Sequence, residues 1–384
     1  MITFDAVTKR YPDGTVAVDA LDLEVPDGKT VVLVGPSGCG KTTSLRMINR
    51  LIEPTEGTIL LDGKDIRQGN PAQLRRGIGY VIQQTGLFPH RTVEDNIGTV
   101  PVLNGWPRKK ARDRATELLS LVGLDPSLAK RYPHQLSGGQ QQRVGVARAL
   151  AADPPVLLMD EPFSAVDPVV RASLQELLLS LQAELRKTIV LVTHDIEEAI
   201  KVGDLVALFR PHGKIAQLAP PDELLAAPAD DYVAGFVGFD RGIRRLSFVP
   251  TQELALSTGP VLPADATVAK ARAAGQPWIL VTEPDSGAPR GWVNTAKLAD
   301  LPAETPLAQA ETEAGGHSFA VGTDSLRAAL DAAVLSPAGQ AVGVDGAGRV
   351  LGVASFDQLR DAIQAADSGP EGARAGTYQR GQRP

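Results

Sequence analysis

A glycine-rich segment near the N-terminus has the residue types and spacing to bind a polyphosphate. Residues 35–42 read GPSGCGKT and fit the pattern G-x-x-x-x-G-K-[ST]. Glycines allow backbone N–H groups to surround an anion at a helix start, where the helix dipole also favours negative charge. Lys41 would then contact the β- and γ-phosphates, and the Thr42 hydroxyl would help to hold Mg²⁺. A plain glycine turn is the alternative, but the apolar run before the loop and the helical pattern after it favour phosphate binding.

A second helix start further along the chain could also bind phosphate. Residues 136–150 read LSGGQQQRVGVARAL, in which Ser137 and two glycines open a helical pattern. The first N–H groups of a helix have no partner within the helix, so this N-terminus offers free donors. A helix that is merely capped by serine is the structural alternative, and the full run of residues argues against it.

Two acids and a histidine lie at the ends of two apolar runs and could act on a water molecule. VLLMDEP (156–162) places Asp160 where it can reach Mg²⁺ through water, and Glu161 can polarise the attacking water. IVLVTHD (189–195) places His194 beside Glu161 if the two strands are neighbours. Adjacent acids are often only solvated and a lone histidine is usually structural, but the two phosphate-binding segments upstream favour catalysis.

Short apolar runs carry the glycine loop, the acids and the histidine, and they predict parallel strands that are buried on both faces. The runs occupy residues 30–35, 156–160 and 188–193, and a helical pattern follows each of them, at 41–51, 171–186 and 195–203. This alternation predicts an α/β domain with a mainly parallel sheet over residues 1–237. Residues 106–152 have helical patterns throughout and are expected to form a helical insertion.

The chain changes in character after this domain. A basic stretch at 238–250 is expected to be a connector, and residues 251–366 contain a weak internal repeat with copies at 261–301 and 319–363. Each copy has an Asp, a helix, a strand, a glycine-containing turn, a second strand starting at a glycine, and a short helix. Residues 367–384 lack apolar periodicity, which predicts a disordered tail.

Two pairs of residues align between the two copies of the repeat. The first copy also contains two tryptophans. Asp265 aligns with Asp324, and Gly291 aligns with Gly352. Trp278 and Trp292 could suggest an aromatic cage for a quaternary ammonium group. Because both tryptophans lie on predicted strands, we expect them to pack in the core instead.

The composition limits the functional classes. The chain has 384 residues, 22% charged and 43% hydrophobic, as expected for a globular protein of more than one domain. The net charge of −6 gives no electrostatic basis for nucleic-acid binding. The single cysteine, Cys39, excludes an internal disulfide framework and indicates a reducing compartment. No run approaches about 18 apolar residues and the first residues lack a signal-peptide pattern, so a membrane role would require a partner.

Residues 1–237 resemble the ATP-binding subunit of an ABC transporter, a P-loop NTPase with a helical subdomain that uses ATP and Mg²⁺. The resemblance implies that the glycine loop is the Walker A loop, which binds ATP through Gly35, Pro36, Ser37, Gly38, Cys39, Gly40, Lys41, Thr42 and Thr43. The second helix start resembles the signature, which contacts the ATP of the other subunit through Leu136, Ser137, Gly138, Gly139 and Gln140.

The resemblance also implies the catalytic set. Glu161 matches the catalytic glutamate and His194 matches the switch histidine. Asp160 matches the Walker B acid, which would hold Mg²⁺ together with Thr42.

Three further motifs of the family have matches in this sequence. Gln83, in YVIQQTGLFPH, matches the Q-loop glutamine, which takes part in catalysis and in Mg²⁺ binding; counting back from LFPH selects it over Gln84. SAVD (164–167) matches the D-loop and assigns its acid to Asp167. Tyr11 matches the aromatic residue that stacks on adenine.

The resemblance implies an assembly as well as a site. Two copies would form a head-to-tail homodimer, in which each ATP lies between the Walker A loop of one subunit and the signature of the other. The groove around residues 83–96 would take a cytoplasmic helix of an integral membrane permease, to which an extracytoplasmic binding protein delivers the solute. The chain would then be a peripheral subunit on the cytoplasmic face of a bacterial plasma membrane.

Three stretches narrow the resemblance to importers of quaternary amines such as glycine betaine, carnitine, choline and proline betaine. They are residues 47–66, 78–101 and 236–247. In that subgroup a pair of CBS modules often follows the ATPase, and the repeat resembles a degenerate α+β pair, with the VVD-x-x-G pattern in the second copy only, at 342–352. Such a pair could bind an adenine nucleotide, sense ionic strength or only dimerise. The tail is basic, with Arg374, Arg380 and Arg383 against Glu371, which argues against ionic sensing by an acidic tail.

Two alternatives for the function stay open at this point. The chain could energise the import of another small solute, because the choice of subgroup depends on resemblance alone. It could also be a non-transport ABC ATPase that acts on DNA or ribosomes, which the acidic charge and the lack of a long coiled coil or a second ATPase copy disfavour.

Overall fold

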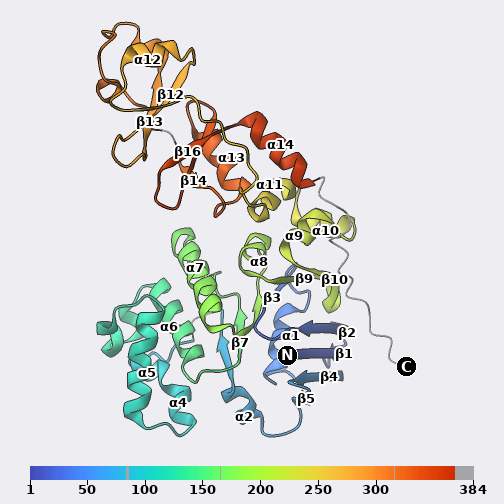
Figure 1. Cartoon of the computed structure of the whole chain (residues 1–384). Helices are drawn as coiled ribbons and strands as arrows, with labels where there is room; N and C mark the ends of the chain where they lie inside the picture. The colour runs from blue at the N-terminus through green and yellow to red at the C-terminus, as the bar shows by residue number, and fades with distance from the viewer. Residues whose placement is uncertain (84–85, 165, 315, 368–384) are drawn as a thin grey trace. The chain divides into compact units, whose positions relative to one another are not determined.

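The computed structural model describes residues 1–83, 86–164, 166–314 and 316–367. The chain divides into two compact units, Met1–Phe239 and Asp240–Pro384 (Figure 1). Residues 368–384, nearly all of the tail expected to be disordered, lie outside the described residues. Throughout the described part of the chain, every helix is too short or too polar to cross a membrane.

The first unit is built on a six-stranded sheet with the order β10-β9-β3-β8-β7-β6. Its strands are β3 (Thr30–Val34), β6 (Ile78–Val81), β7 (Val156–Asp160), β8 (Thr188–Val192), β9 (Leu205–Arg210) and β10 (Lys214–Ala219). All neighbours are parallel except β10, which runs antiparallel at one edge. Every residue of β3, β7 and β8 is buried, so the predicted parallel sheet with two covered faces is confirmed.

Alternate residues of these strands face two different cores. One core is shared with α1 (Lys41–Ile48) and an antiparallel sheet, and it contains Val31 and Leu33 of β3. The antiparallel sheet has the order β2-β1-β4-β5, with strands β1 (Ile2–Arg10), β2 (Val16–Val25), β4 (Glu56–Leu61) and β5 (Lys64–Asp65). The other core contains Val32 and Val34 and is closed by most of the remaining helices. Period-two burial on both faces is what a covered parallel sheet requires.

The helices on the second face include the predicted helical insertion. They are α3 (Val93–Ile97), α4 (Thr99–Leu103), α5 (Arg108–Leu121), α6 (Gly138–Leu150), α7 (Pro168–Leu185), α8 (Ile196–Val202), α9 (Pro221–Ala226) and α10 (Asp231–Val237). The short helix α2 (Pro71–Arg76) packs instead against the first core, through Leu74. Two short 3₁₀ turns, η1 (Pro126–Lys130) and η2 (Pro133–Gln135), connect α5 to α6, and a third, η3 (Pro211–Gly213), connects β9 to β10. The helical region begins at α3, earlier than the expected residue 106, because Thr92 caps that helix by accepting a hydrogen bond from the backbone N–H of Asp95.

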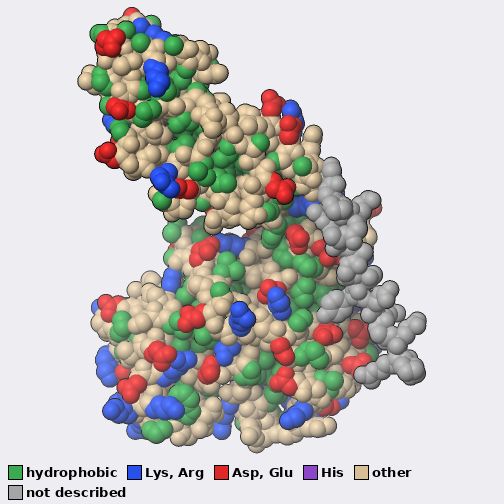
Figure 2. Space-filling view, viewed as in Figure 1, with side chains coloured by type: hydrophobic (Ala, Val, Ile, Leu, Met, Phe, Trp, Pro, Cys, Tyr) green, Lys and Arg blue, Asp and Glu red, His purple; other side chains and the backbone are tan. Residues whose placement is uncertain are grey.

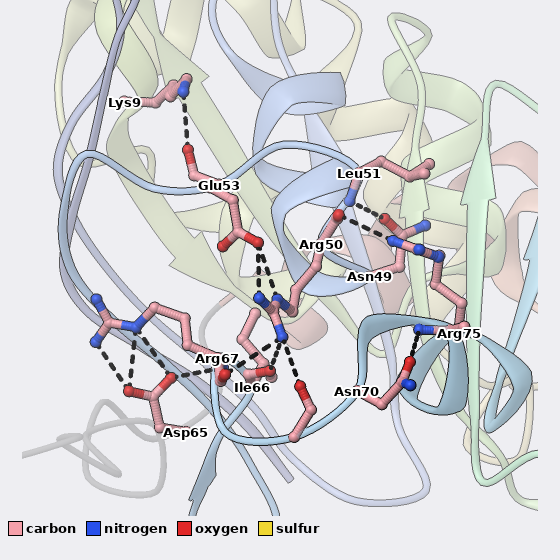
Figure 3. A network of polar contacts seen from close by, with 12 residues as sticks. Lys9, Asn49, Arg50, Leu51, Glu53, Asp65, Ile66, Arg67, Asn70 and Arg75 are labelled. Carbon is pink, nitrogen blue, oxygen red and sulfur yellow. Dashed lines mark hydrogen bonds and ion pairs between the residues drawn. The ribbon is translucent and has the colours of Figure 1, made fainter.

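A polar network ties the end of α1 to the segment that enters α2 and β6 (Figure 3). Arg50 has a positive φ of 54°. Its guanidinium donates to Glu53 and to the backbone carbonyls of Ile66, Arg67 and Gly69 at 3.0–3.3 Å. Arg75 donates to the carbonyl of Arg50 at 3.1 Å, and Lys9 donates to the carbonyl of Glu53 at 2.8 Å. β6 follows α2 in the chain and ends at Val81, two residues before Gln83.

The second unit contains two copies of one β-α-β-β arrangement, which matches the repeat expected from the sequence. The first copy has β11 (Val261–Pro263), α12 (Val268–Ala273), β12 (Trp278–Thr282), β13 (Pro289–Asn294) and η5 (Thr295–Leu298). The second copy has β14 (Ser318–Ala320), α13 (Leu326–Leu335), β15 (Gln340–Val344), β16 (Val350–Ser355) and α14 (Phe356–Asp367), and η6 (Leu307–Gln309) lies between the copies. In each copy the first strand is parallel to the second, and the second is antiparallel to the third.

The aligned glycines of the repeat occupy equivalent positions, although not the predicted strand starts. The third strands begin two residues earlier, at Pro289 and Val350, because the hairpins extend their pairing. A Cβ at Gly291 or Gly352 would lie 2.8 or 2.7 Å from a backbone oxygen of another extended segment, so both positions require glycine. Trp292 is fully buried in a core that spans the two copies, and Trp278 is half-buried against the same core. Core packing is thus confirmed in full for Trp292 and in part for Trp278.

The stretch expected to be a connector has its own structure. It contains α11 (Arg241–Arg245) and η4 (Leu246–Phe248). Leu246 is buried in the core of the second copy together with Leu254 and Phe319. Leu246 and the partly buried Val249 therefore join this stretch to the core of the second unit.

Candidate functional site

The glycine loop lies between β3 and α1, as its flanking patterns predict. Gly40 caps α1 with a φ of 105°, and a Cβ there would lie 2.3 Å from the carbonyl oxygen of Ala17. A Cβ at Gly38 would meet no atom within 4 Å among the described residues, so the loop is open on that side. The Lys41 side chain is buried, and its Nζ donates to the carbonyl oxygens of Gly35 at 2.7 Å and Pro36 at 2.9 Å. The loop is thus an open cradle with an ammonium group beneath it, which fits a polyphosphate.

The other predicted residues of this loop differ in exposure. Pro36 and Ser37 are exposed at its tip, and Thr43 is half-buried in the first turn of α1. Cys39 is buried, its Sγ lies 3.7 Å from Lys41 Nζ, and burial raises the pKa of its thiol. A buried thiol with a raised pKa is a poor nucleophile, in line with a purely structural place in the loop.

Thr42 and Asp160 meet at the carboxyl end of β7. The Thr42 hydroxyl donates to Asp160 Oδ1 at 3.0 Å, and the Asp160 side chain is almost completely buried. Arg46 Nη2 and the Tyr80 hydroxyl donate to Asp160 Oδ2 at 3.2 and 3.5 Å. A hydroxyl beside a carboxylate is a pair of hard oxygen ligands of the kind that Mg²⁺ prefers, so these residues fit the metal.

Glu161 follows Asp160 in the chain, and its side chain contacts two of the other predicted residues. Its carboxylate accepts a hydrogen bond from Gln83 Nε2 at 2.8 Å and lies 3.3 Å from His194 Nδ1. Parallel pairing of Asp160 with Val192 brings His194 alongside, and the backbone N–H of Glu161 donates to the Val192 carbonyl at 2.9 Å. Glu161 has a φ of 45°, and such strain in a residue other than glycine is typical of functional sites. Gln83, Glu161 and His194 therefore converge from three strand ends.

The signature segment forms the start of α6. Ser137 and Gln140 make a reciprocal capping box: Ser137 Oγ accepts from the Gln140 N–H at 3.3 Å, and Gln140 Oε1 accepts from the Ser137 N–H at 3.0 Å. Gly138 is exposed, and Leu136 is buried beneath it. The cap satisfies the N–H of the third helical residue, so the N–H groups of the two glycines stay available to an anion.

Two predicted residues lie in turns next to these segments. Asp167 caps α7 by accepting hydrogen bonds from the N–H groups of Val169 and Val170 at 3.1 and 3.0 Å. Tyr11 directly follows β1, and its ring centroid lies 5.3 Å from Lys9 Nζ. A half-exposed aromatic ring can stack on a nucleobase.

Two residues that contact Asp160, Arg46 and Tyr80, were not predicted from the sequence. Arg46 follows Thr42 by four positions on α1, so both side chains lie on one helix face. Tyr80 lies on β6, the neighbour of β7 in the sheet. The helical spacing was a usable signal for Arg46, whereas Tyr80 depended on the strand order.

Comparisons with known proteins agree with this geometry. A family model described as "ABC transporter" matches residues 18–164. The glycine betaine/carnitine/choline transport ATP-binding protein OpuCA of Bacillus subtilis is 50% identical over 272 residues, which cover 71% of each chain. The osmoprotectant import ATP-binding protein OsmV of Salmonella typhimurium is 54% identical over 65% of this chain and 66% of the relative.

A solved structure extends the similarity to the fold. The dimeric ATP-binding cassette MJ0796 bound to ADP and Pi aligns with a TM-score of 0.53 and 35% identity, over 58% of this chain and 99% of that chain. Together with the two transport relatives, this match assigns the first unit. The chain therefore belongs to the ATP-binding subunits of ABC transporters, and it is an ATPase that uses ATP with Mg²⁺.

Proposed function

We propose that this ATPase energises the import of a quaternary amine osmoprotectant, such as glycine betaine, carnitine, choline or proline betaine, through a partner permease. The single observation that carries the proposal is the convergence of Gln83 and His194 on Glu161, next to Thr42 and Asp160, in a chain this similar to named quaternary amine transport subunits. A cluster of this kind supplies both a metal site and a base for water.

The residues of the first subunit would bind and orient the nucleotide. Residues 35–43 surround the phosphates, and Lys41 exchanges its two carbonyl acceptors for phosphate oxygens. Tyr11 stacks on the adenine. When bound, Mg²⁺ neutralises charge on the phosphates, and Thr42, Gln83 and Asp160 are the side chains that would hold it.

Glu161 and His194 would act on the attacking water and the γ-phosphate. The Glu161 carboxylate is held between two side chains, so its remaining lone pairs can accept a proton from an adjacent water molecule. His194 is exposed on the side away from the core, where it can contact the γ-phosphate. Polarisation of the water by Glu161 is the step on which hydrolysis depends.

A second copy of the chain would complete the site. One loop covers the phosphates on one side only, and the free N–H groups at Gly138 and Gly139 of a head-to-tail partner would cover the other. The other residues proposed to face the partner's nucleotide or loop are Leu136, Ser137, Gln140 and Asp167. ATP would then hold the dimer closed until hydrolysis releases it.

A groove in the helical region would receive the permease. It has a volume of about 580 Å³ and is lined by residues that include Phe88, Arg91, Glu94, Leu103 and Arg112. On the face shown in Figure 2, Lys and Arg side chains gather over α4 and α5. A cytoplasmic helix of the permease fits this mixture of aromatic and charged lining, and docking there would make the chain a peripheral subunit on the cytoplasmic face of a bacterial plasma membrane.

We propose that residues 1–237 form the ATPase domain and residues 251–366 a degenerate CBS pair with a regulatory role. The duplicated β-α-β-β arrangement and the shared core around Trp292 support this assignment. Calorimetric titration of the full chain with AMP tests nucleotide sensing, because AMP lacks the phosphates that the glycine loop requires. Absence of heat would count against AMP as a ligand and would favour ionic sensing or a role in dimerisation alone.

The substrate assignment is tested by reconstituting the chain with its permease and binding protein. We expect ATP turnover to rise when the binding protein delivers glycine betaine or a related quaternary amine. A complex that responds only to an amino acid or a polyamine would overturn the substrate while leaving the ATPase assignment intact.

A further inference from the structure

An ion pair joins the first turns of α7 and α8, two helices that lie next to the site. Arg171 lies in the first turn of α7, where its backbone N–H donates to the carbonyl of Asp167 at 2.8 Å. Its Nε lies 3.7 Å from Glu198 Oε1 on α8, and its Nη1 lies 4.0 Å from Asp195 Oδ2. The two helices pack side by side (Figure 1). Arg171 therefore connects the residue that caps α7 to the segment that follows His194.

Glu198 continues this connection to the backbone on either side of His194. The Thr193 hydroxyl donates to Glu198 Oε2 at 2.5 Å and accepts from the backbone N–H of Asp195 at 3.1 Å. The Thr193 N–H donates to the carbonyl of Leu33 at 3.1 Å. Thr193 and Glu198 are 1% and 5% exposed, so this small network is shielded from competing water.

The His194 ring depends on that backbone for its place. Its side chain is 56% exposed and reaches Glu161 at 3.3 Å. An exposed ring receives little support from packing, so a change in the backbone of residues 193–195 would move it relative to Glu161. Small displacements of a catalytic group have large effects on rate.

We infer that Arg171 and Glu198 are positioning residues for His194, and that they link it to the Asp167 end of α7. The inference rests on the proposed dimer, in which the partner presses on that end of α7. Closure of the dimer would then be transmitted through Arg171, Glu198 and Thr193 to the histidine of the same subunit.

The charges of the network support a specific role for Arg171. Burial raises the pKa of the Glu198 carboxyl, while the hydrogen bond from Thr193 and the charge of Arg171 act in the opposite direction. A buried carboxylate that loses its cationic partner shifts toward the protonated form. Removing the guanidinium would therefore disturb Glu198 and its bond to Thr193, in addition to breaking one ion pair.

A second ion pair between the same helices provides a matched control. Lys201 Nζ of α8 lies 2.8 Å from Glu176 Oε1 of α7, further along both helices than Arg171 and Glu198. If any fastening of α7 to α8 were enough, Lys201→Met and Arg171→Met should have similar effects. If Arg171 positions His194, the effects should differ.

The test compares ATP turnover and nucleotide affinity in the full-length chain. We expect Arg171→Met to lower kcat about 10-fold or more, with the Kd for a fluorescent ATP analogue changed less than about twofold. Arg171→Lys should restore most of the rate, and Lys201→Met should leave it unchanged. In a His194→Ala background, Arg171→Met should add less than about a twofold loss, because both changes act through one group.

Two results would overturn the inference. One is an equal loss of kcat in Arg171→Met and Lys201→Met. The other is a loss of kcat from Arg171→Met that is as large in the His194→Ala background as in the wild-type chain. If Arg171→Met fails to fold, Glu198→Gln decides, since it keeps a partner for Thr193 and loses the charge; normal turnover of that variant would refute the role.

An inactive wild-type chain would refute the proposed function and leave a second readout for this inference. The chain has five histidines, so the His194 signal in ¹⁵N-histidine spectra can be assigned with His194→Ala. That signal should shift in Arg171→Met and stay in place in Lys201→Met. Unchanged spectra in both variants would refute the positioning role.

Discussion

Replacing Gly138 with alanine should separate the folding of the subunit from its activity. Gly138 is the first residue of α6 and is exposed, and its backbone is not in the left-handed region. A Cβ at this position would meet no atom within 4 Å among the described residues. Inside one subunit, the substitution is therefore sterically free.

We expect Gly138→Ala to raise the stability of the folded subunit and to lower its rate of ATP turnover. Gly→Ala at a compatible position stabilises by about 0.4–1 kcal/mol, because the unfolded chain loses conformational freedom. For a unit of this size, that gain should raise Tm by about 1–4 °C. In the dimer, however, the added methyl group would lie where a phosphate must approach the backbone, and a displacement of about 1 Å can cost about 100-fold in rate.

Gly139 provides the comparison that makes this prediction specific. A Cβ at Gly139 would lie 2.5 Å from Val170 Cγ1 of the same subunit, so Gly139→Ala should also cost about 1–3 kcal/mol of folding stability. Thermal unfolding and steady-state ATPase assays on both variants separate the two effects. Normal turnover in Gly138→Ala, or a lower Tm for that variant, would refute the assignment of this glycine to the partner's nucleotide.

Three further substitutions test other parts of the structure. Thr42→Val removes the hydroxyl that donates to Asp160 at 3.0 Å, and it should raise the Mg²⁺ concentration for half-maximal ATPase activity about 10-fold or more; an unchanged requirement would count against this ligand. Gly352→Ala would place a Cβ 2.7 Å from the carbonyl oxygen of Ser257. Urea unfolding should show that the second unit loses about 1–3 kcal/mol of stability. Unchanged stability would count against this close packing. Asp345 accepts hydrogen bonds from backbone N–H groups of the turn that follows it, and these lower the pKa of its carboxyl. A carboxyl group whose pKa is lowered by folding stabilises the folded state above its unfolded-state pKa, and this stabilisation is lost as the pH falls. At pH 7, Asp345→Asn should therefore have a lower Tm than the wild-type chain, and the difference should narrow below about pH 4.

The strands that carry the site could be predicted because burial on both faces demands continuous apolar runs. The runs before Asp160 and His194 correspond to β7 and β8, and their parallel pairing brings Glu161 and His194 together. Gln83 was predictable through its motif, and Ser137 was predictable as a helix cap because its side chain satisfies a free N–H group.

The contacts that could not be predicted depend on how strands and helices that are distant in the sequence are arranged in space. Tyr80 reaches Asp160 only because β6 is the neighbour of β7. Arg171 and Glu198 meet because α7 and α8 pack together, and no local pattern in either helix indicates that pairing. In the second unit, the strand starts were misplaced because the hairpins extend their pairing beyond Gly291 and Gly352.

In the proposed cycle, two copies of this chain hold ATP between them, and hydrolysis that depends on Glu161 lets the copies separate. The most direct measurement is the association state of the Glu161→Gln chain in the presence of Mg·ATP, followed by analytical ultracentrifugation together with phosphate release. We expect this variant to form a stable dimer with Mg·ATP and to release almost no phosphate. Turnover at the wild-type rate, or a chain that stays monomeric with Mg·ATP, would contradict the proposed cycle.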